Sequence, residues 1–180
     1  KILFRRGVKI NMADVTNVQL GPCSVSYNNS DLGHTKGGVE VTYEPVYKDV
    51  SVDKYGETVV EKYLTGEKLS AKVPLAEFTI VNLKAAMPQG TYAGAANARI
   101  TLGKSAGQQA KVLAAQLVLH PLNQGTRRHD VIFHKAYVAS QVVLPHNLED
   151  EKVIEVTFEA LLDETKTDGN YLGMIGDSTA

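Results

Sequence analysis

The segment of this chain that comes closest to a known chemical motif is residues 98–105. Its end, Gly103-Lys104-Ser105, matches a relaxed phosphate-binding loop, in which backbone amides and a lysine hold nucleotide phosphates. Such a loop needs a buried strand before it and a helix after it, whereas residues 91–98 make a poor buried strand and Ala98 replaces the first glycine. We expect a surface loop here, and a nucleotide-binding protein that uses Lys104 and Ser105 remains an alternative.

The other reactive side chains are scattered along the sequence. His129 and His134 are five residues apart, so on a strand they point to opposite faces and do not form a metal pair. The single Cys23 cannot form an internal disulfide and has no base nearby in the sequence, which is typical of a small core residue. We therefore expect no enzyme activity, no cofactor and no structural metal.

Acidic and apolar residues alternate in two segments, 39–45 and 152–162. In the second segment Ile154, Val156, Phe158, Ala160 and Leu162 point inward. This period of two predicts half-buried strands. The outward residues are Glu40, Thr42, Glu44, Glu155, Thr157 and Glu159. The four glutamates among them fit a general acid and base pair, a solvated face, or a shared acidic wall.

Between the strand at 39–45 and a matching alternation at 67–75, residues 46–64 predict a hairpin arm. The apolar positions change parity at Pro45, which predicts a bend or bulge there, and the polar residues 53–57 predict the turn. A hairpin alone is marginal in water, so the arm is expected to need a partner surface. Its candidate contact residues are Val46, Val50, Val52, Tyr55, Val59, Val60 and Tyr63.

Composition indicates one globular domain. The chain has 180 residues, 43% hydrophobic and 22% charged, and its 19 basic and 20 acidic residues give a net charge of -1, which disfavours a dedicated DNA binder. No apolar stretch approaches the length of a membrane span, so no membrane insertion is expected. We expect residues 1–13 to form an N-terminal extension that contributes little to the fold, with one domain over residues 14–180.

The remaining elements predict a mainly β protein. Strands are expected at 14–20, 23–27, 129–139 and 152–162, a short one at 99–102, and one at 111–120 where a helix competes; the one clear helix lies between Ala76 and Met87. Several antiparallel strands with one flanking α-helix indicate a β-sandwich or open barrel, whose exposed edges favour self-association.

Short motifs along residues 17–177 resemble those of the major tail tube proteins of long-tailed bacteriophages and related tail-like particles. The resemblance depends on their order and spacing, and the motifs are Asp31-Leu32-Gly33, Thr35-Lys36-Gly37-Gly38-Val39, Gly66-Glu67, Val73-Pro74-Leu75-Ala76-Glu77, Leu117-Val118-Leu119-His120-Pro121, Val156-Thr157-Phe158-Glu159-Ala160-Leu161 and Ile175-Gly176-Asp177.

This resemblance implies a structural virion protein, made in the host cytoplasm, that forms hexameric rings stacked into the tail tube, the conduit for genome ejection. It implies contacts with other copies, with terminator and baseplate or tip proteins, and with double-stranded DNA that passes without specific binding. It implies an inner sheet that joins a closed barrel, with the 46–64 arm against the neighbouring ring. A conduit must not bind DNA phosphates, so the outward residues of the two acidic strands are candidates for the lumen wall. A monomeric β-sandwich binding module is the second alternative.

Overall fold

The computed structural model describes residues 21–94, 97–123, 129–146 and 151–177, so the predicted N-terminal extension and the strand at 14–20 lie outside the described residues. The fold is mainly β and antiparallel, as predicted. One sheet has the order β2-β1-β7-β8-β9-β4-β3, and a further strand, β10, pairs with β8. The strands of this sheet are β1 (Cys23–Tyr27), β2 (Ser30–Asp31), β3 (Glu40–Ser51), β4 (Val59–Leu75), β7 (Ala115–Pro121), β8 (Asp130–Val138), β9 (Ile154–Ala160) and β10 (Gly173–Gly176).

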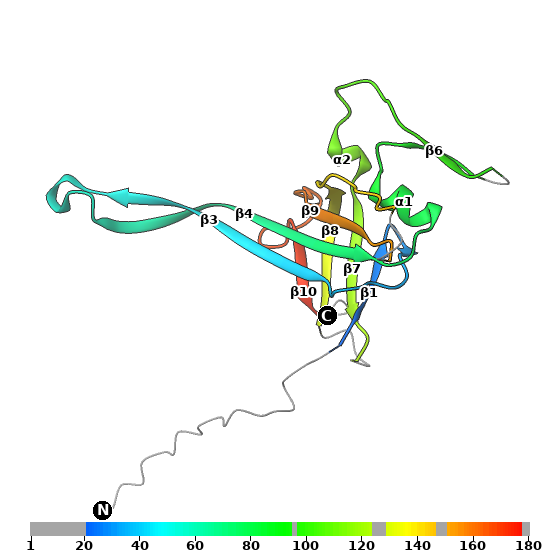
Figure 1. Ribbon diagram of the computed structural model, residues 1–180. Helices are drawn as coiled ribbons and strands as arrows, with labels where there is room; N and C mark the ends of the chain where they lie inside the picture. Colours follow the sequence, from blue (N-terminus) through cyan, green and yellow to red (C-terminus); the bar gives the residue numbers. More distant parts are fainter. Residues whose placement is uncertain (1–20, 95–96, 124–128, 147–150, 178–180) are drawn as a thin grey trace, which may run out of the picture.

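The sheet folds over itself at β8. One edge of this strand pairs with β10 over Asp130–Phe133 and then with β9 over Ala136–Val138, while its other edge pairs with β7. In Figure 1, β7, β8 and β10 stand upright behind the crossing strands β3, β4 and β9. The result is two layers that cross at a steep angle, an arrangement in which strands that switch sheets make the corners. The described strands form no closed barrel, because β2 and β3 end the strand order.

The core lies between these two layers and follows the predicted alternation. In β4 the inward residues Leu69 to Leu75 are buried, and in β9 Ile154, Val156 and Phe158 are fully buried whereas Ala160 is half-buried. The ring of Phe158 lies 5.0 Å from that of Tyr27 on β1. Leu162 is an exception: it is 47% exposed, because β9 ends at Ala160. The largest buried side chains are Phe133, Phe158, Leu32, Leu75, Leu117 and Ile154.

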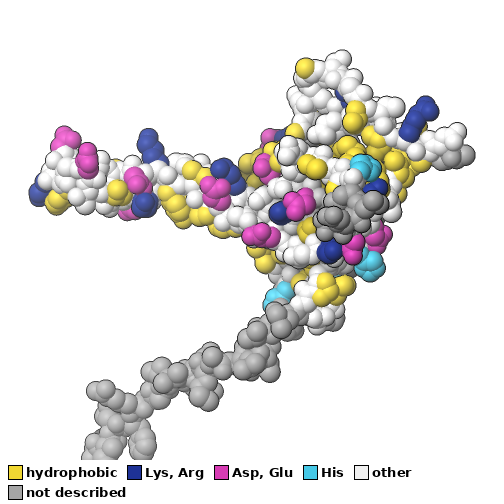
Figure 2. Space-filling view, viewed as in Figure 1, with side chains coloured by type: hydrophobic (Ala, Val, Ile, Leu, Met, Phe, Trp, Pro, Cys, Tyr) yellow, Lys and Arg dark blue, Asp and Glu magenta, His cyan; other side chains and the backbone are white. Residues whose placement is uncertain are grey.

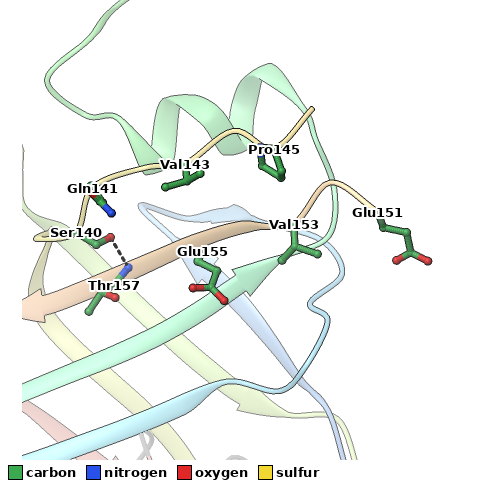
Figure 3. Close-up of a pocket in the computed structure, with 8 residues that line it drawn as sticks. All are labelled: Ser140, Gln141, Val143, Pro145, Glu151, Val153, Glu155 and Thr157. Carbon is green, nitrogen blue, oxygen red and sulfur yellow. Dashed lines mark hydrogen bonds between the residues drawn. The ribbon is translucent and has the colours of Figure 1, made fainter. Parts of the chain in front are cut away.

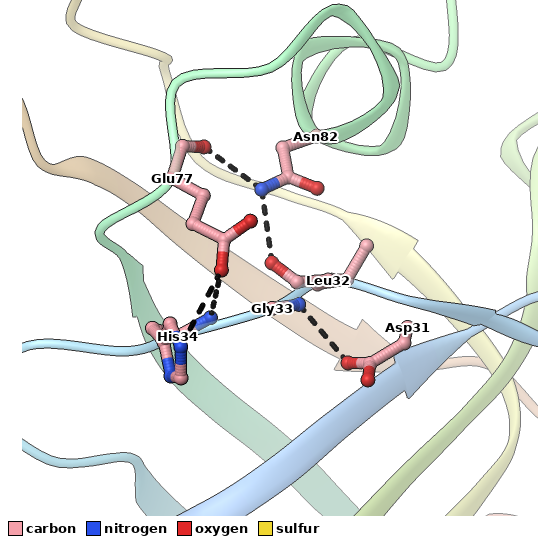
Figure 4. Close-up of polar contacts among 6 residues, drawn as sticks. All are labelled: Asp31, Leu32, Gly33, His34, Glu77 and Asn82. Atoms are coloured by element: carbon pink, nitrogen blue, oxygen red, sulfur yellow. Dashed lines mark hydrogen bonds and ion pairs between the residues drawn. The ribbon is translucent and has the colours of Figure 1, made fainter.

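The predicted helix is α1 (Ile80–Ala86), which starts four residues later than the apolar spacing indicated. The Thr79 hydroxyl accepts a hydrogen bond from the Asn82 backbone amide and so caps the helix. Asn82 is buried, and its side-chain amide donates to the carbonyl oxygens of Leu32 and Glu77 at 2.9 and 2.8 Å. The Glu77 carboxylate in turn accepts from the His34 backbone amide, and Figure 4 shows these contacts binding α1 to the loop after β2.

The strand predicted at 23–27 is β1 with the predicted bounds, whereas β6 (Arg99–Thr101), β8 and β9 are each shorter than predicted. The segment 111–120 contains both competing structures, since α2 (Ala110–Leu113) is followed directly by β7. The predicted strand at 99–102 is β6, which pairs with β5 (Thr91–Ala93) in a separate two-stranded hairpin. The strand β10 was not predicted.

The arm is present as predicted. β3 and β4 pair along their length and continue beyond the body, where a 3-10 turn at Asp53–Tyr55 closes the hairpin, and Figure 1 shows it projecting away from the other strands. The irregularity expected at Pro45 lies one residue later and in the partner strand. Val46 pairs with Gly66 and Tyr47 with Leu64, so Thr65 is the extra residue of a bulge, and its hydroxyl donates to the Val46 carbonyl at 3.1 Å.

Candidate functional site

The arm carries most of the exposed large apolar side chains of β3 and β4. Among its predicted contact residues only Val50 is half-buried; the other six are exposed, led by Tyr63 at 63%. Three further residues share this exposure and were missed by the sequence interpretation: Tyr43, Tyr47 and Leu64. The first was expected to point into the core. Tyr43 does lie on the inward side of β3, but the body does not extend far enough along the strand to cover it.

Both faces of the arm are apolar. Both register shifts of the pairing, at Thr65 and at Val60, add their extra residue to β4, so β3 alternates without interruption. Tyr43, Pro45 and Tyr47 therefore continue the face that is buried in the body. Tyr47 pairs with Leu64 on that face. Val46 and Val50 lie on the opposite face. Figure 2 shows hydrophobic side chains along the underside of the arm near its root. A face that is apolar and exposed over this length is typical of a surface that another protein covers.

Polar contacts on the arm are local. Lys62 Nζ lies 2.8 Å from Asp49 Oδ1 across the hairpin, and the Tyr43 hydroxyl donates to the Glu67 carboxylate, a hydrogen bond that raises the pKa of Tyr43. Exposed ion pairs contribute about 0–1 kcal/mol each to stability. The Asp49–Lys62 pair therefore helps to fix the register of the hairpin but adds little to its stability. The arm is stabilised in isolation by little beyond its backbone ladder.

The six candidate wall residues lie together on one face of β3, β4 and β9. The register places Glu40 beside Lys72 and Lys72 beside Thr157, and it places Thr42 beside Ser70 and Ser70 beside Glu159; Glu44 and Glu155 lie in the neighbouring rows. This face is not purely acidic. Lys68 and Lys72 of β4 share it, with Nζ 3.4 Å from a Glu44 oxygen and 3.1 Å from a Glu155 oxygen. Four carboxylates and two lysines leave a net charge of -2.

The free side of β9 is covered by the segment that follows β8. The Ala139 amide donates to the Thr157 carbonyl, and the Thr157 amide donates to the Ser140 hydroxyl, both within hydrogen-bond distance. Figure 3 shows this segment alongside β9, with Glu155 and Thr157 facing a depression of about 530 Å³. Tyr137 donates to Glu159 at 2.7 Å, which raises the pKa of Tyr137. Ion pairs and hydrogen bonds connect the polar side chains of this face. Its carboxylates do not form a separate pair suited to acid and base catalysis.

The phosphate-loop segment has a different surrounding from the one its chemistry needs. Lys104 and Ser105 are exposed in the connection between β6 and α2, β6 is an exposed strand of a small antiparallel hairpin, and α2 has four residues and starts at Ala110. A buried parallel strand leading directly into a helix is not formed here by the described residues.

His120 and His134 each contact a different polar side chain. His120 Nδ1 lies 2.6 Å from Asp130 Oδ1, and His134 Nε2 lies 2.8 Å from Asn170 Oδ1. Burial raises the pKa of the Cys23 thiol, so it is a poor nucleophile at neutral pH. Among the residues that the structure describes, no three His, Cys, Asp or Glu side chains are placed to hold a metal ion.

Neither a scan against protein-family models nor a search of curated proteins gave a match. Within the described ranges, no helix has the length and apolar character needed to cross a membrane.

Proposed function

We propose that this protein is a structural subunit of a bacteriophage tail tube or of a related tail-like particle. Its copies join as hexameric rings, and the rings stack into the conduit for genome ejection. The proposal follows the resemblance of the sequence motifs. The observation that carries it is the arm, a hairpin with exposed apolar side chains on both faces, which a monomer leaves in water.

The energetics of the arm favour assembly. Full burial of one large apolar side chain is worth roughly 1.5–3 kcal/mol, so covering several of the exposed valines and tyrosines offsets the cost of association. Two apolar faces require two covering surfaces. We infer that the arm inserts between copies, with one face against its own ring and the other against the next.

The polar face of β3, β4 and β9 suits the wall of a conduit. A net charge of -2 on this face, repeated around a ring, gives phosphates no attractive surface, and the paired lysines limit the repulsion. In the proposed tube, double-stranded DNA passes this wall without specific binding. Terminator and baseplate or tip proteins are the expected partners at the ends of the tube, and the virion tail is the expected location.

The test is the assembly state of the purified full chain. We expect negative-stain electron microscopy to show rings or tubes, and sedimentation to show species much larger than 19.5 kDa that grow with protein concentration. A chain that stays monomeric at all concentrations, or that binds a nucleotide through Lys104, contradicts the proposal.

A further inference from the structure

A second uncovered apolar surface lies on the other side of the body from the arm. We call it the platform, and it consists of α1, α2 and the β5–β6 hairpin. Val112 is 74% exposed and Leu102 is 70% exposed, with Val81 and Tyr92 exposed beside them. Figure 1 shows the arm leaving the body on the left, α1 and β6 on the right and α2 above the body, and Figure 2 shows hydrophobic side chains gathered on the right.

The platform contains a hollow of suitable size. A depression of about 470 Å³ lies between α1, α2 and β1, and Val81, Lys84, Pro88, Val112 and Leu113 are among its lining residues. This volume falls in the range of pockets that accept a small ligand or a few side chains. Lys84 stands at its edge with Nζ 5.0 Å from the centre of the Tyr92 ring.

The charged residues of the platform are all basic. Residues 78–115 contain four basic residues, Lys84, Arg99, Lys104 and Lys111, and no acidic residue, so the net charge of this stretch is +4. Lys111 pairs with Glu164 at 2.9 Å. The described carboxylates form no ion pair with the other three. The platform therefore offers an apolar hollow lined in part by Lys84, on a stretch in which three of the four basic side chains form no ion pair with a described carboxylate.

The outer part of the arm has the complementary charge. Beyond the Asp49–Lys62 ion pair, residues 50–61 contain three acidic residues, Asp53, Glu57 and Glu61, against the single Lys54, a net charge of -2. The same stretch exposes Val52, Val59 and Val60 together with Tyr55. The outer part of the arm thus combines acidic and apolar groups, and the platform combines basic and apolar groups.

We propose that the platform is the docking site for the arm of a second copy of this chain. The arm and platform of one copy point away from each other, so they cannot pair within a single chain (Figure 1). Two different surfaces of the same protein that fit each other make a head-to-tail contact, which repeats from copy to copy into a ring or a filament. The inference rests on the proposed function and specifies which surface of the neighbour the arm contacts.

A charge exchange between two variants tests the docking. One variant carries Asp53→Lys and Glu57→Lys on the arm, and the other carries Lys84→Glu and Arg99→Glu on the platform. Each alone places like charges at the contact, so we expect assembly of either variant to fall at least tenfold at low salt. An equimolar mixture pairs basic arms with acidic platforms, and acidic arms with basic platforms, so we expect it to assemble again. A single chain with all four changes is expected to do the same.

A covalent test is independent of charge. In a Cys23→Ala background, Tyr55→Cys on one copy and Val112→Cys on another should form an intermolecular disulfide under mild oxidation, and Tyr55→Cys with Leu162→Cys serves as the matched control. Selective cross-linking to Val112→Cys supports the docking. The two cysteines are in different chains, so a disulfide between them must join two copies.

The outcomes separate the two proposals. If replacing the arm abolishes assembly but the platform variant assembles like the unmodified chain, the arm docks elsewhere, and the docking proposal is wrong while the proposed function stands. If the unmodified chain forms no oligomer, both fail. Circular dichroism and thermal melting of each variant identify a loss of folding, and a folded variant that follows neither pattern contradicts the docking.

Discussion

The same two strands behave differently inside the body and in the arm. In the body, β4 lies between β3 and β9, with Ala71 and Val73 fully buried on one face and Lys72 in water on the other. Beyond the bulge at Thr65 the two strands have only each other, and apolar side chains lie exposed on both faces. Polar and apolar residues alternate along a strand when the rest of the protein covers only one of its two faces. A strand pair that loses clean alternation while keeping its β-branched residues indicates a surface to be covered later by a partner.

The most severe way to break this comparison is to remove the arm. Replacing residues 46–64 with a short Gly/Ser linker should leave the body folded, because its core uses none of these side chains, and should abolish tubes. Size-exclusion chromatography, electron microscopy and circular dichroism measure the two effects together. Long tubes of normal appearance from this variant would mean that the arm is not the stacking element.

Single truncations in each region sharpen the comparison. Phe158→Ala removes a fully buried ring and should lower the free energy of unfolding by about 3–5 kcal/mol. Tyr63→Ala, at a side chain 63% exposed, should change the unfolding of the monomer by no more than about 0.5 kcal/mol but raise the concentration needed for assembly. Urea unfolding and sedimentation measure these values. A large destabilisation of the monomer by Tyr63→Ala would show that the arm packs on its own body.

The polar face gives a third contrast, since it faces solvent in the body yet is proposed to face DNA. Changing Glu40, Glu44, Glu155 and Glu159 to Lys joins four new positive charges to Lys68 and Lys72. Assembled tubes of this variant should retain DNA, with affinity falling about a thousandfold or more between 50 and 200 mM salt. Particles carrying it should eject their genome poorly at low salt.

The matched control changes the same four glutamates to Gln, which removes negative charge without adding positive charge. Co-sedimentation of DNA with tubes, and ejection from particles, compare the two variants. Normal ejection by fully assembled Lys variants, without salt-dependent retention of DNA, would place these side chains outside the lumen.

Acid should destabilise the body through the buried Asp163. Asp163 is buried, and its hydrogen bond from Lys135 Nζ at 2.8 Å lowers its pKa from 3.8 to about 2. A lowered pKa in the folded state stabilises the protein above the pKa of the unfolded chain, and this contribution is lost as pH falls from about 4 to about 2. Asp163→Asn should lower the melting temperature at pH 7 and have a smaller effect near pH 2. Asp168→Asn, at an exposed aspartate that forms no ion pair with the described residues, is the control, and an equal effect of Asp163→Asn at both pH values would contradict the linkage.

The smallest effect is expected at the phosphate-loop segment. Lys104 is exposed in a connection of the platform, so Lys104→Ala should leave folding unchanged and reduce assembly by no more than a small factor. Saturable ATP binding that this change abolishes would instead favour the nucleotide-binding alternative. Equilibrium dialysis with ATP and thermal melting make the distinction.

Much of the fold could be predicted because local patterns and tertiary burial agree in its main strands. In β9, Ile154, Val156 and Phe158 alternate with polar residues and all three are buried. The end of α1 was predictable from Pro88-Gln89-Gly90, but its start was not, because Thr79 and not the apolar spacing decides it. The four-residue β10 has no pattern of its own and exists because β8 has a free edge there.

The candidate site was predicted in part. The arm and the six wall residues follow from alternation, and the structure places those six on one face. That Lys68 and Lys72 share the face could have been inferred from the pairing of the two strands around the turn, which sets the cross-strand neighbours. The exposure of Tyr43 could not, because the sequence does not mark where the body ends. The platform depends on α1, α2 and the β5–β6 hairpin coming together, which no single segment encodes.

The continuity of β4 from the tip of the arm into the body has a mechanical consequence. Ser70–Leu75 of this strand pairs with β9, and the hydrogen bonds of that ladder lie across the strand direction. If copies assemble as proposed, stretching the tube would pull on the arm along β4, so this load would meet the ladder in shear and all of its hydrogen bonds would resist together instead of opening one after another. Tension between neighbouring copies would thus be carried by a strand pair whose inward face is fully buried, which would make the arm a tether as well as a contact.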